Sequence, residues 1–147
     1  MSMELEIALI HPDAKIPEYK TVGAACFDIC GIEEVKVKSG AIVDVPTGLV
    51  FRLPKDHVMV LQPRSSSPKL GYIMPHSVGI IDSDYCGPDD QLFLRLKNVT
   101  SRTITFEKHQ RLVQAYILPL PKVAFKEISK DYLGQHSRGG FGSTGKK

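Results

Sequence analysis

The feature that most constrains the fold of this chain is a two-residue alternation of apolar and other side chains in short segments. In residues 4–10 (ELEIALI), Leu5, Ile7 and Leu9 alternate with Glu or Ala, and residues 34–38 (EVKVK) show the same pattern. Such alternation is typical of β-strands with one buried face. No segment keeps an apolar period of 3.6 residues over three turns, and the 10 prolines and 12 glycines disfavour long helices.

Further strand-like segments follow along the chain, separated by turn residues. They cover residues 41–53, 57–62, 91–98, 102–106, 111–118 and 123–128. Short strands at regular spacing predict an all-β protein, a jelly-roll-like barrel or sandwich, with one helical turn near residues 65–70. We expect the jelly-roll domain to span residues 1–133 and a flexible glycine-rich arm to span residues 134–147.

Length and charge narrow the classes of function. The chain has 147 residues, of which 42% are hydrophobic and 24% charged, and its net charge is +3. That length is sufficient for one domain with a hydrophobic core. The mild charge favours a small anionic ligand over direct nucleic-acid binding, which usually requires a dense basic stripe.

Two further features predict a cytoplasmic protein without membrane attachment. Cys26, Cys30 and Cys86 are odd in number and lack metal-ligand spacing, so we expect reduced, structural thiols in a reducing compartment. No apolar stretch approaches the length of a membrane span, and no apolar run follows a basic start.

Residues 62–68 (QPRSSSP) form a candidate phosphate-binding loop after an apolar strand. Arg64 provides a planar, permanently charged fork that suits phosphate oxygens. Ser65, Ser66 and Ser67 provide hydroxyl groups and closely spaced backbone N–H groups that can surround an anion. The alternative interpretation is a polar loop with a surface arginine.

Residues 79–87 (GIIDSDYCG) place Asp82 where an apolar strand ends, a usual position for an acid that is held rigidly but stays reachable. Its carboxylate could orient a water molecule or accept a bond from a ribose hydroxyl, and Tyr85 offers a flat face to a sugar. The alternative is an Asx-type turn in which Asp82 caps its own backbone. We expect Asp84 to be the structural acid of the two.

Three more polar residues interrupt apolar segments. Asp28 is an isolated acid in residues 23–30 (GAACFDIC), and it needs an arginine or a hydrated divalent cation as a partner. Arg111 and Gln114 are three residues apart, so a regular strand would place them on opposite faces. Arg111 could be an ion-pair partner, and Gln114 could be a ligand of phosphate or water.

The last residues, 134–147 (GQHSRGGFGSTGKK), hold five of the twelve glycines and one aromatic residue. Such a composition cannot build a core, so a free tail is the simplest interpretation. A glycine-rich segment with Ser, Thr, Arg and Phe can also wrap a phosphate chain and stack its ring on a base. Both interpretations stay open from this segment alone.

Taken together and in order, five segments resemble the five motifs of the trimeric dUTPase family: AACFD, PRSSS, GIIDSDYCG, QRLVQAYI and RGGFGSTG. The resemblance covers nearly the whole chain. It implies a jelly-roll homotrimer with three active sites, each shared among subunits. It also implies hydrolysis of dUTP to dUMP and pyrophosphate, with Mg²⁺ on the triphosphate, which would limit uracil incorporation into DNA and supply dUMP for thymidylate synthesis.

The resemblance implies a role for each candidate residue. Asp82 would orient the attacking water and touch the sugar 3′-OH, and Tyr85 would pack under the deoxyribose and exclude a 2′-OH. Asp28 would lie near the catalytic water and contact the metal indirectly, through its bound waters. The other implied substrate-binding positions are Arg64, Ser65, Ser66, Gln114, Ser143 and Thr144 for phosphates, His76, Ile80, Ile81 and Leu92 for the uracil hairpin, and His136, Arg138, Phe141 and Gly142 in the arm, with Phe141 stacked on uracil.

Four positions depart from the family pattern. His136 occupies the usual arginine position of the fifth motif, so either Arg138 replaces that arginine or the contact to the γ-phosphate is weakened. Ser67 and Pro68 replace a more usual pair and could shorten the helical turn. His76 stands where many relatives have a uracil-contacting asparagine. The longer segment 86–94 (CGPDDQLFL) could reshape the uracil hairpin.

Two rival functions use the same scaffold. A dCTP deaminase-like or bifunctional enzyme would need a glutamate base near the pyrimidine ring, and the site motifs contain no glutamate. A regulatory protein that only binds a partner would not need Asp82 or the arm motif, so both argue for retained catalysis.

Overall fold

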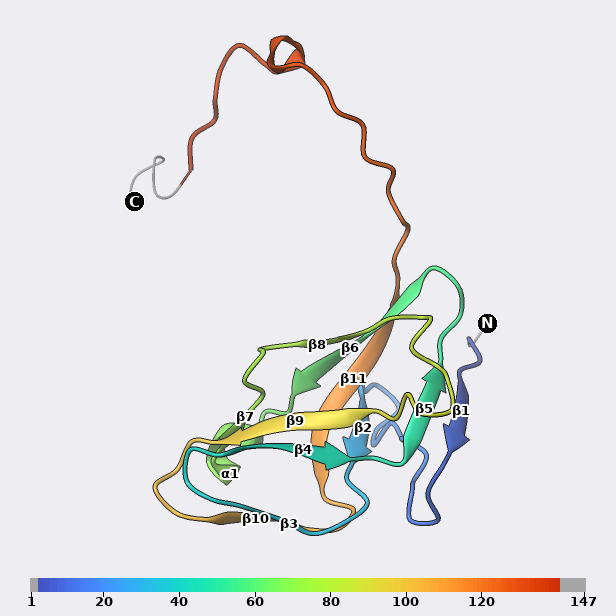
Figure 1. The fold of residues 1–147 in the computed structure, drawn as a ribbon, viewed down its shortest axis with the longest axis vertical. Helices are drawn as coiled ribbons and strands as arrows, with labels where there is room; N and C mark the ends of the chain where they lie inside the picture. The colour runs from blue at the N-terminus through green and yellow to red at the C-terminus, as the bar shows by residue number, and fades with distance from the viewer. Residues whose placement is uncertain (1–2, 141–147) are drawn as a thin grey trace.

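The computed structural model describes residues 3–140 and confirms the all-β prediction (Figure 1). Its strands form antiparallel sheets, of which the largest has four strands. That sheet has the order β2 (Phe27–Cys30), β11 (Arg111–Pro119), β6 (His57–Pro63) and β8 (Gly79–Ile81). A three-stranded sheet has the order β4 (Ile42–Pro46), β9 (Phe93–Asn98) and β7 (Tyr72–Ile73). Two pairs complete the body, β1 (Glu6–Leu9) with β5 (Leu49–Arg52), and β3 (Val35–Val37) with β10 (Ile104–Phe106).

The only helices in residues 3–140 are short. Helix α1 (Ser67–Leu70) confirms the predicted helical turn and ends at Gly71, whose φ of 81° lies in the left-handed region that glycine tolerates best. A 3₁₀ turn, η1 (Lys130–Tyr132), begins at Ser129, whose side chain accepts a hydrogen bond from the backbone N–H of Asp131. Within the same residues, no helix is long and apolar enough to cross a membrane.

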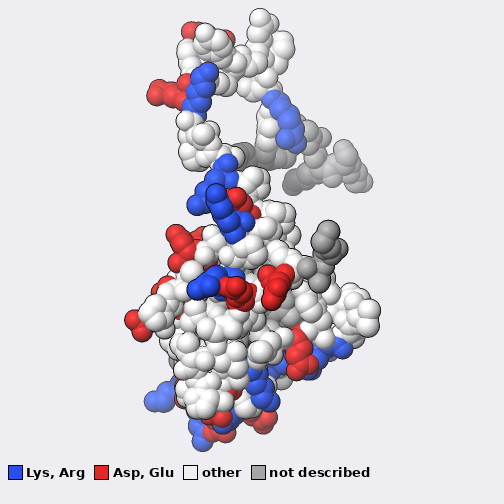
Figure 2. All heavy atoms as spheres, turned by 90° about the vertical axis from the view of Figure 1, so that its right-hand side faces the viewer, with Lys and Arg blue, Asp and Glu red and all other residues white. Residues whose placement is uncertain are grey.

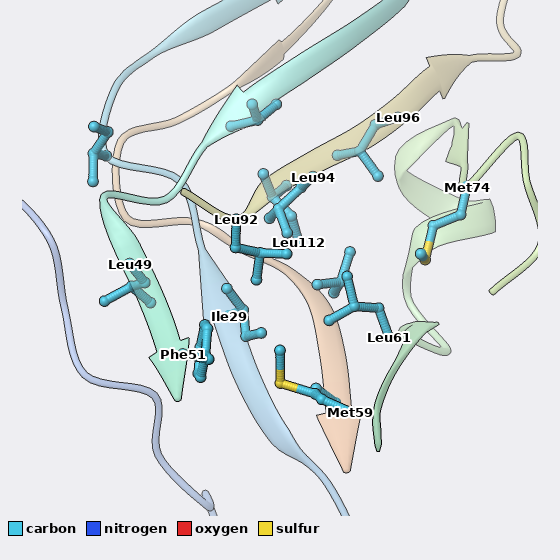
Figure 3. Packing of buried hydrophobic residues seen from close by; sticks show 14 of the residues in the cluster. Ile29, Leu49, Phe51, Met59, Leu61, Met74, Leu92, Leu94, Leu96 and Leu112 are labelled. Atoms are coloured by element: carbon cyan, nitrogen blue, oxygen red, sulfur yellow. The ribbon is translucent and has the colours of Figure 1, made fainter. Parts of the chain in front are cut away.

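A single hydrophobic cluster joins the sheets (Figure 3). Every sheet contributes to it, because the alternating strands turn one set of apolar side chains inward. Strand β9 is the clearest case, since buried residues alternate along it with exposed or half-buried ones. The labelled core residues in Figure 3 are Ile29, Leu49, Phe51, Met59, Leu61, Met74, Leu92, Leu94, Leu96 and Leu112.

The end of strand β9 is fixed by Asn98, a fully buried polar residue. Its side-chain Nδ2 donates to the carbonyl oxygens of Val37 and Arg102, at 2.9 and 2.7 Å. Its Oδ1 accepts from the backbone N–H and the hydroxyl of Thr100, both at 2.8 Å. All the hydrogen-bonding capacity of the Asn98 amide is therefore used to join β9, the end of β3 and the loop that follows β9.

The predicted strand at residues 123–128 is wrong. The chain leaves the body after β11 and runs away from it without strand structure, as the orange and red segment of Figure 1 shows. A strand needs a neighbour that accepts and donates its ladder hydrogen bonds, and no strand of the same chain between residues 3 and 140 lies beside this segment. Apolar side chains along it are exposed, including Val123, Phe125 and Tyr132.

The cysteines and the surface charge agree with the sequence. Cys26, Cys30 and Cys86 are free thiols in half-buried positions, and burial raises the pKa of the Cys30 thiol. On the face shown in Figure 2, acidic and basic side chains are intermixed. That face carries no continuous basic stripe of the kind that tracks a nucleic-acid backbone.

We predict that replacement of Asn98 by alanine lowers the free energy of unfolding by about 2–3 kcal/mol, because backbone groups of Val37, Thr100 and Arg102 lose their partner. Urea unfolding followed by circular dichroism measures this change. Thr100→Val, which removes only the hydroxyl of a partner at the rim, serves as the control and should lose less than about half as much. Equal stability of Asn98→Ala and the unmodified protein would contradict the assignment.

Candidate active site

A carboxylate held between two arginines lies where three strands of the large sheet meet. Asp28 on β2 forms ion pairs with Arg64, at 3.0 Å from Nε, and with Arg111, at 2.8 Å from Nη1. The Asp28 side chain is only 13% exposed, against 22% for Arg64 and 43% for Arg111. The partner that the sequence requires for Asp28 is thus a pair of arginines. We call Asp28, Arg64, Arg111 and Gln114 the Asp28 cluster.

The prediction that Arg111 and Gln114 lie on opposite faces is wrong, because β11 carries a β-bulge. Arg111 pairs with Cys30 and Gln114 pairs with Asp28, while the register shifts between Arg111 and Val113. The extra residue, Leu112, is buried together with Val113. An inserted residue reverses the alternation, so Arg111 and Gln114 both point to the face that carries Asp28. Gln114 also donates from Nε2 to the carbonyl oxygen of Pro63, at 3.0 Å.

The serine-rich turn follows directly from this cluster. The Ser67 hydroxyl donates to the Arg64 carbonyl oxygen at 2.9 Å, which closes the turn into α1. Ser65 is exposed, whereas the Ser66 hydroxyl oxygen is buried and has no partner within residues 3–140. Pro68 occupies the start of α1, where its missing N–H has no cost.

A second group of predicted residues lines one cavity of about 570 Å³. We call it the Asp82 cavity. The cavity lies against strand β8. The backbone of this strand comes close to Leu61 at Gly79, where a Cβ atom would lie 3.0 Å from the Leu61 Cβ. The sequence predicted six of its lining residues, which are His76, Ile80, Ile81, Asp82, Tyr85 and Leu92.

Asp82 and Tyr85 stand at one end of this cavity. Asp82 follows the last residue of β8, and its carbonyl oxygen accepts from the Tyr85 N–H at 3.2 Å, which makes a turn. The Asp82 carboxylate has no hydrogen-bond partner among residues 3–140, so it does not cap its own backbone as the Asx interpretation requires. The expectation that Asp84 is the structural acid is wrong, since its carboxylate has no hydrogen-bond partner among residues 3–140 either. Asp90 has that role and accepts from the Gly87 N–H at 2.7 Å. The Tyr85 hydroxyl donates to the Gln91 carbonyl oxygen at 3.1 Å.

His76 has a fixed ring orientation at the cavity. Its Nδ1 lies 2.8 Å from the carbonyl oxygen of Val78, and the Val78 N–H donates back to the His76 carbonyl oxygen at 2.9 Å. A carbonyl oxygen can only accept, so Nδ1 carries the proton in this contact. Between them, Ser77 has a φ of 66°, an uncommon conformation for a residue other than glycine.

Sequence reasoning missed two charged residues of the cavity, Asp44 and Arg95. They face each other across β4 and β9, and Arg95 donates from Nε and Nη2 to the two oxygens of Asp44, both at 2.7 Å. These hydrogen bonds lower the pKa of the Asp44 carboxyl and raise that of Arg95. No local feature of either segment marks this pair, because only the register of β4 on β9 places the two charges opposite each other.

The two groups share no residue, and the described arm residues belong to neither. Neither Arg64, Ser65, Ser66 nor Gln114 lines the Asp82 cavity. His136 and Arg138 are exposed on the segment that leaves the body after residue 119 (Figure 1), and from here on we call all of the chain from residue 120 the arm. The arm residues Phe141, Gly142, Ser143 and Thr144 lie outside the described residues. Within one chain, the structure therefore separates the predicted site into the Asp28 cluster, the Asp82 cavity and the arm.

Comparison with known sequences gives a consistent answer. The family model dUTPase matches residues 12–145. A deoxyuridine 5'-triphosphate nucleotidohydrolase of Nautilia profundicola is 34% identical over 145 residues, which are 98% of this chain and 100% of that protein. The protein of the same name from Neisseria gonorrhoeae is 36% identical over 151 residues, covering 99% of each chain.

Solved structures agree with this match. The crystal structure of dUTPase from Streptococcus mutans superposes with a TM-score of 0.75 at 33% identity, covering 81% of this chain and 98% of that chain. A dUTPase of Staphylococcus bacteriophage 80alpha, solved with dUpNHpp, superposes with a TM-score of 0.83 over 98% of this chain and 99% of that chain. Because the identity is 20%, the phage structure bears on the fold alone.

We predict that Asp28→Asn lowers the free energy of unfolding by about 2 kcal/mol, because two arginines lose the charge that lies between them in a largely buried position. Glu6→Gln is the matched control, since Glu6 pairs with Arg52 at 3.0 Å but both side chains are more than half exposed. That exposed pair should contribute less than about 0.5 kcal/mol. Unfolding by urea at equal ionic strength measures the free energy of unfolding of both variants. Similar losses of stability in the two variants would refute the special role of Asp28.

Proposed function

The chain belongs to the dUTPase family and hydrolyses dUTP to dUMP and pyrophosphate, and we propose that the Asp82 cavity binds the nucleoside and the Asp28 cluster binds the phosphate chain. The observation that carries this assignment is the Asp82 carboxylate. It stands at the end of β8, exposed and without a hydrogen-bond partner in the described chain. An acid in this position is free to accept a proton or a hydrogen bond from water.

The Asp82 cavity suits a pyrimidine nucleoside. Its wall combines apolar side chains, among them Val78, Ile80 and Leu92, with the flat ring of Tyr85. We infer that the Tyr85 ring packs under the deoxyribose, because its bond to the Gln91 carbonyl oxygen holds it in place. A ring in that position leaves no space for a 2′-OH and selects dUTP over UTP. Backbone groups near Leu92 would read the uracil.

The Asp28 cluster suits a phosphate chain. Two guanidinium groups share one carboxylate, so the three charges sum to a single positive charge. Arg64 donates from Nε to Asp28 and from Nη1 to the Arg111 carbonyl oxygen. These two bonds fix the plane of the Arg64 guanidinium group and leave its other N–H donors for phosphate oxygens. Gln114 on the same face, together with Ser65 and Ser66 in the adjoining turn, would complete the phosphate contacts.

The reaction breaks one phosphoanhydride bond. Water adds to phosphorus, dUMP keeps the new P–O bond, and pyrophosphate leaves with the oxygen that bridged the two groups. Asp82 would accept a hydrogen bond from this water and aim its oxygen at phosphorus. Catalysis of this kind depends mostly on positioning and on neutralising charge, which the arginines would supply.

The donor set fits a magnesium ion that arrives with the substrate. Both carboxylate oxygens of Asp28 are bonded to arginines, and residues 3–140 contain no group of three or more His, Cys, Asp or Glu side chains that could hold a metal. Mg²⁺ commonly binds through substrate phosphates and retained waters, so Asp28 would contact it through a water. When bound, the ion would neutralise part of the triphosphate charge.

We further infer that the active site is assembled from a homotrimer. The Asp28 cluster and the Asp82 cavity share no lining residue, and the arm runs away from both (Figure 1). The exposed apolar side chains of the arm, including Phe125 at 96% exposure, would be covered by a neighbouring copy. The cavity of one subunit, the cluster of a second and the arm of a third would then form one site.

We predict that Asp82→Asn lowers kcat for dUTP by roughly 10²–10⁴-fold, the usual range for a lost general base, because the amide cannot accept the proton of the attacking water. A pyrophosphate-release assay measures it, with dCTP, dTTP and UTP as comparison substrates. Asp84→Asn, two residues along the same turn, is the control and should stay near the unmodified rate. Normal turnover in a folded Asp82→Asn protein would remove Asp82 from the mechanism.

The arm provides a separate prediction. A chain truncated after Tyr132 should remain a trimer by light scattering but lose most activity, because it keeps the apolar part of the arm and lacks the glycine-rich motif. Truncation after Gly145 removes only Lys146 and Lys147 and should be fully active. Full turnover of the shorter protein would show that the glycine-rich segment is a tail, and a monomer at active concentration would contradict the shared site.

A further inference from the structure

The bulge in β11 is held by two side-chain donors. The Tyr72 hydroxyl donates to the carbonyl oxygen of Leu112, the extra residue of the bulge, at 2.8 Å. Arg64 donates from Nη1 to the neighbouring carbonyl oxygen, that of Arg111, at 3.0 Å. A bulge disrupts the local ladder and leaves its extra residue without a regular partner. These two side chains therefore donate to carbonyl oxygens of β11 at the point where the bulge interrupts the backbone ladder.

Tyr72 is well placed to hold this strand rigidly. It lies on β7 in the three-stranded sheet and is fully buried, so its side chain crosses the core to reach β11 in the other sheet. Its ring meets that of Phe106 edge-on, with centroids 5.1 Å apart and planes at 79°. Burial raises the pKa of the Tyr72 phenol to about 12, so the hydroxyl keeps its proton and donates throughout the range in which enzymes work.

We propose that Tyr72 is a positioning residue for phosphate binding, because its hydroxyl keeps the β11 bulge at Leu112 and thereby keeps Arg111 and Gln114 on the face of Asp28. This inference rests on the proposed binding of phosphates at the Asp28 cluster. If the bulge moved by one residue along β11, the alternation would change and one of the two side chains would turn away. Tyr72 itself is buried and does not touch substrate.

The proposal separates phosphate recognition from nucleoside recognition. Arg111 and Gln114 would contact the phosphate chain, whereas the nucleoside would bind in the Asp82 cavity, which Tyr72 does not line. Loss of the Tyr72 hydroxyl should therefore weaken a triphosphate ligand more than a monophosphate with the same base and sugar. General destabilisation would weaken both alike.

The test is Tyr72→Phe, which removes one oxygen and keeps the ring against Phe106. Binding of a non-hydrolysable dUTP analogue with Mg²⁺ and binding of dUMP are measured by calorimetry on the full-length protein. We expect roughly 3- to 10-fold weaker binding of the analogue, the effect of one hydrogen bond, and less than about twofold change for dUMP. Unchanged analogue affinity, or an equal loss for both ligands, would overturn the proposal.

Two companion variants make the result specific. Val37→Ala, a core truncation on strand β3, controls for lost stability and should leave the ratio of the two affinities unchanged. Arg111→Ala should weaken the analogue by itself, and Tyr72→Phe should have little further effect in that background. If Arg111→Ala binds the analogue normally, the proposed phosphate site fails and the inference fails with it. If Arg111→Ala is impaired but Tyr72→Phe is not, only the role of Tyr72 is overturned.

Discussion

The carboxylate of Asp28 is the constraint on which the arrangement of this site depends. Two guanidinium groups so close together would repel each other unless an anion lay between them. Asp28 is that anion, and it ties β2 to the end of β6 and the start of β11 through side chains, in addition to the backbone ladders. Both guanidinium groups thus have a fixed partner before any ligand arrives, which would lower the cost of ordering them around a phosphate chain at the proposed site.

The same sheet connects the two halves of the site while keeping them apart. Strand β6 pairs with β11 through residues 57–63 and with β8 through residues 59–61. Its end leads into Arg64, and its middle supports the strand that ends at Asp82. A rigid strand holds a fixed relation between these groups. Under the proposed function, the complete site would form by assembly of several copies of the chain.

Local patterns predicted most strands, and the family resemblance predicted most residues of the candidate site. The period-two segments become β1, β3, β4, β5, β6, β9, β10 and β11. Residues 123–128 show the same alternation but form no strand, because alternation does not reveal whether a partner strand is present. The prediction that Arg111 and Gln114 lie on opposite faces was wrong for a different reason. A separation of three residues predicts opposite faces only in a regular strand. The consecutive apolar residues Leu112 and Val113 interrupt the alternation and indicate the bulge that the structure contains.

Contacts between residues far apart in the sequence could not be predicted from local patterns. The Asp44–Arg95 pair joins residues 51 apart, and only the register of β4 on β9 brings them together. The Tyr72 hydroxyl likewise reaches a carbonyl oxygen 40 positions away. In their local sequence, Asp44 and Arg95 resemble ordinary surface charges, and Tyr72 resembles an ordinary aromatic residue of a core. Such contacts follow from the topology of the sheets, so they became visible only once the strands were placed.

The arm divides into two parts with different physical behaviour. The apolar part, with Val123, Phe125 and Ile128, can bury surface against a neighbouring copy and would remain bound through repeated turnovers. Residues 134–140 of the glycine-rich part are exposed, and fixing a backbone of this composition would cost on the order of 1–2 kcal/mol per residue. Under the proposed function, contacts of this segment with a base and with phosphates would offset that cost. A triphosphate would then order the segment better than dUMP, which offers only one of the three phosphates.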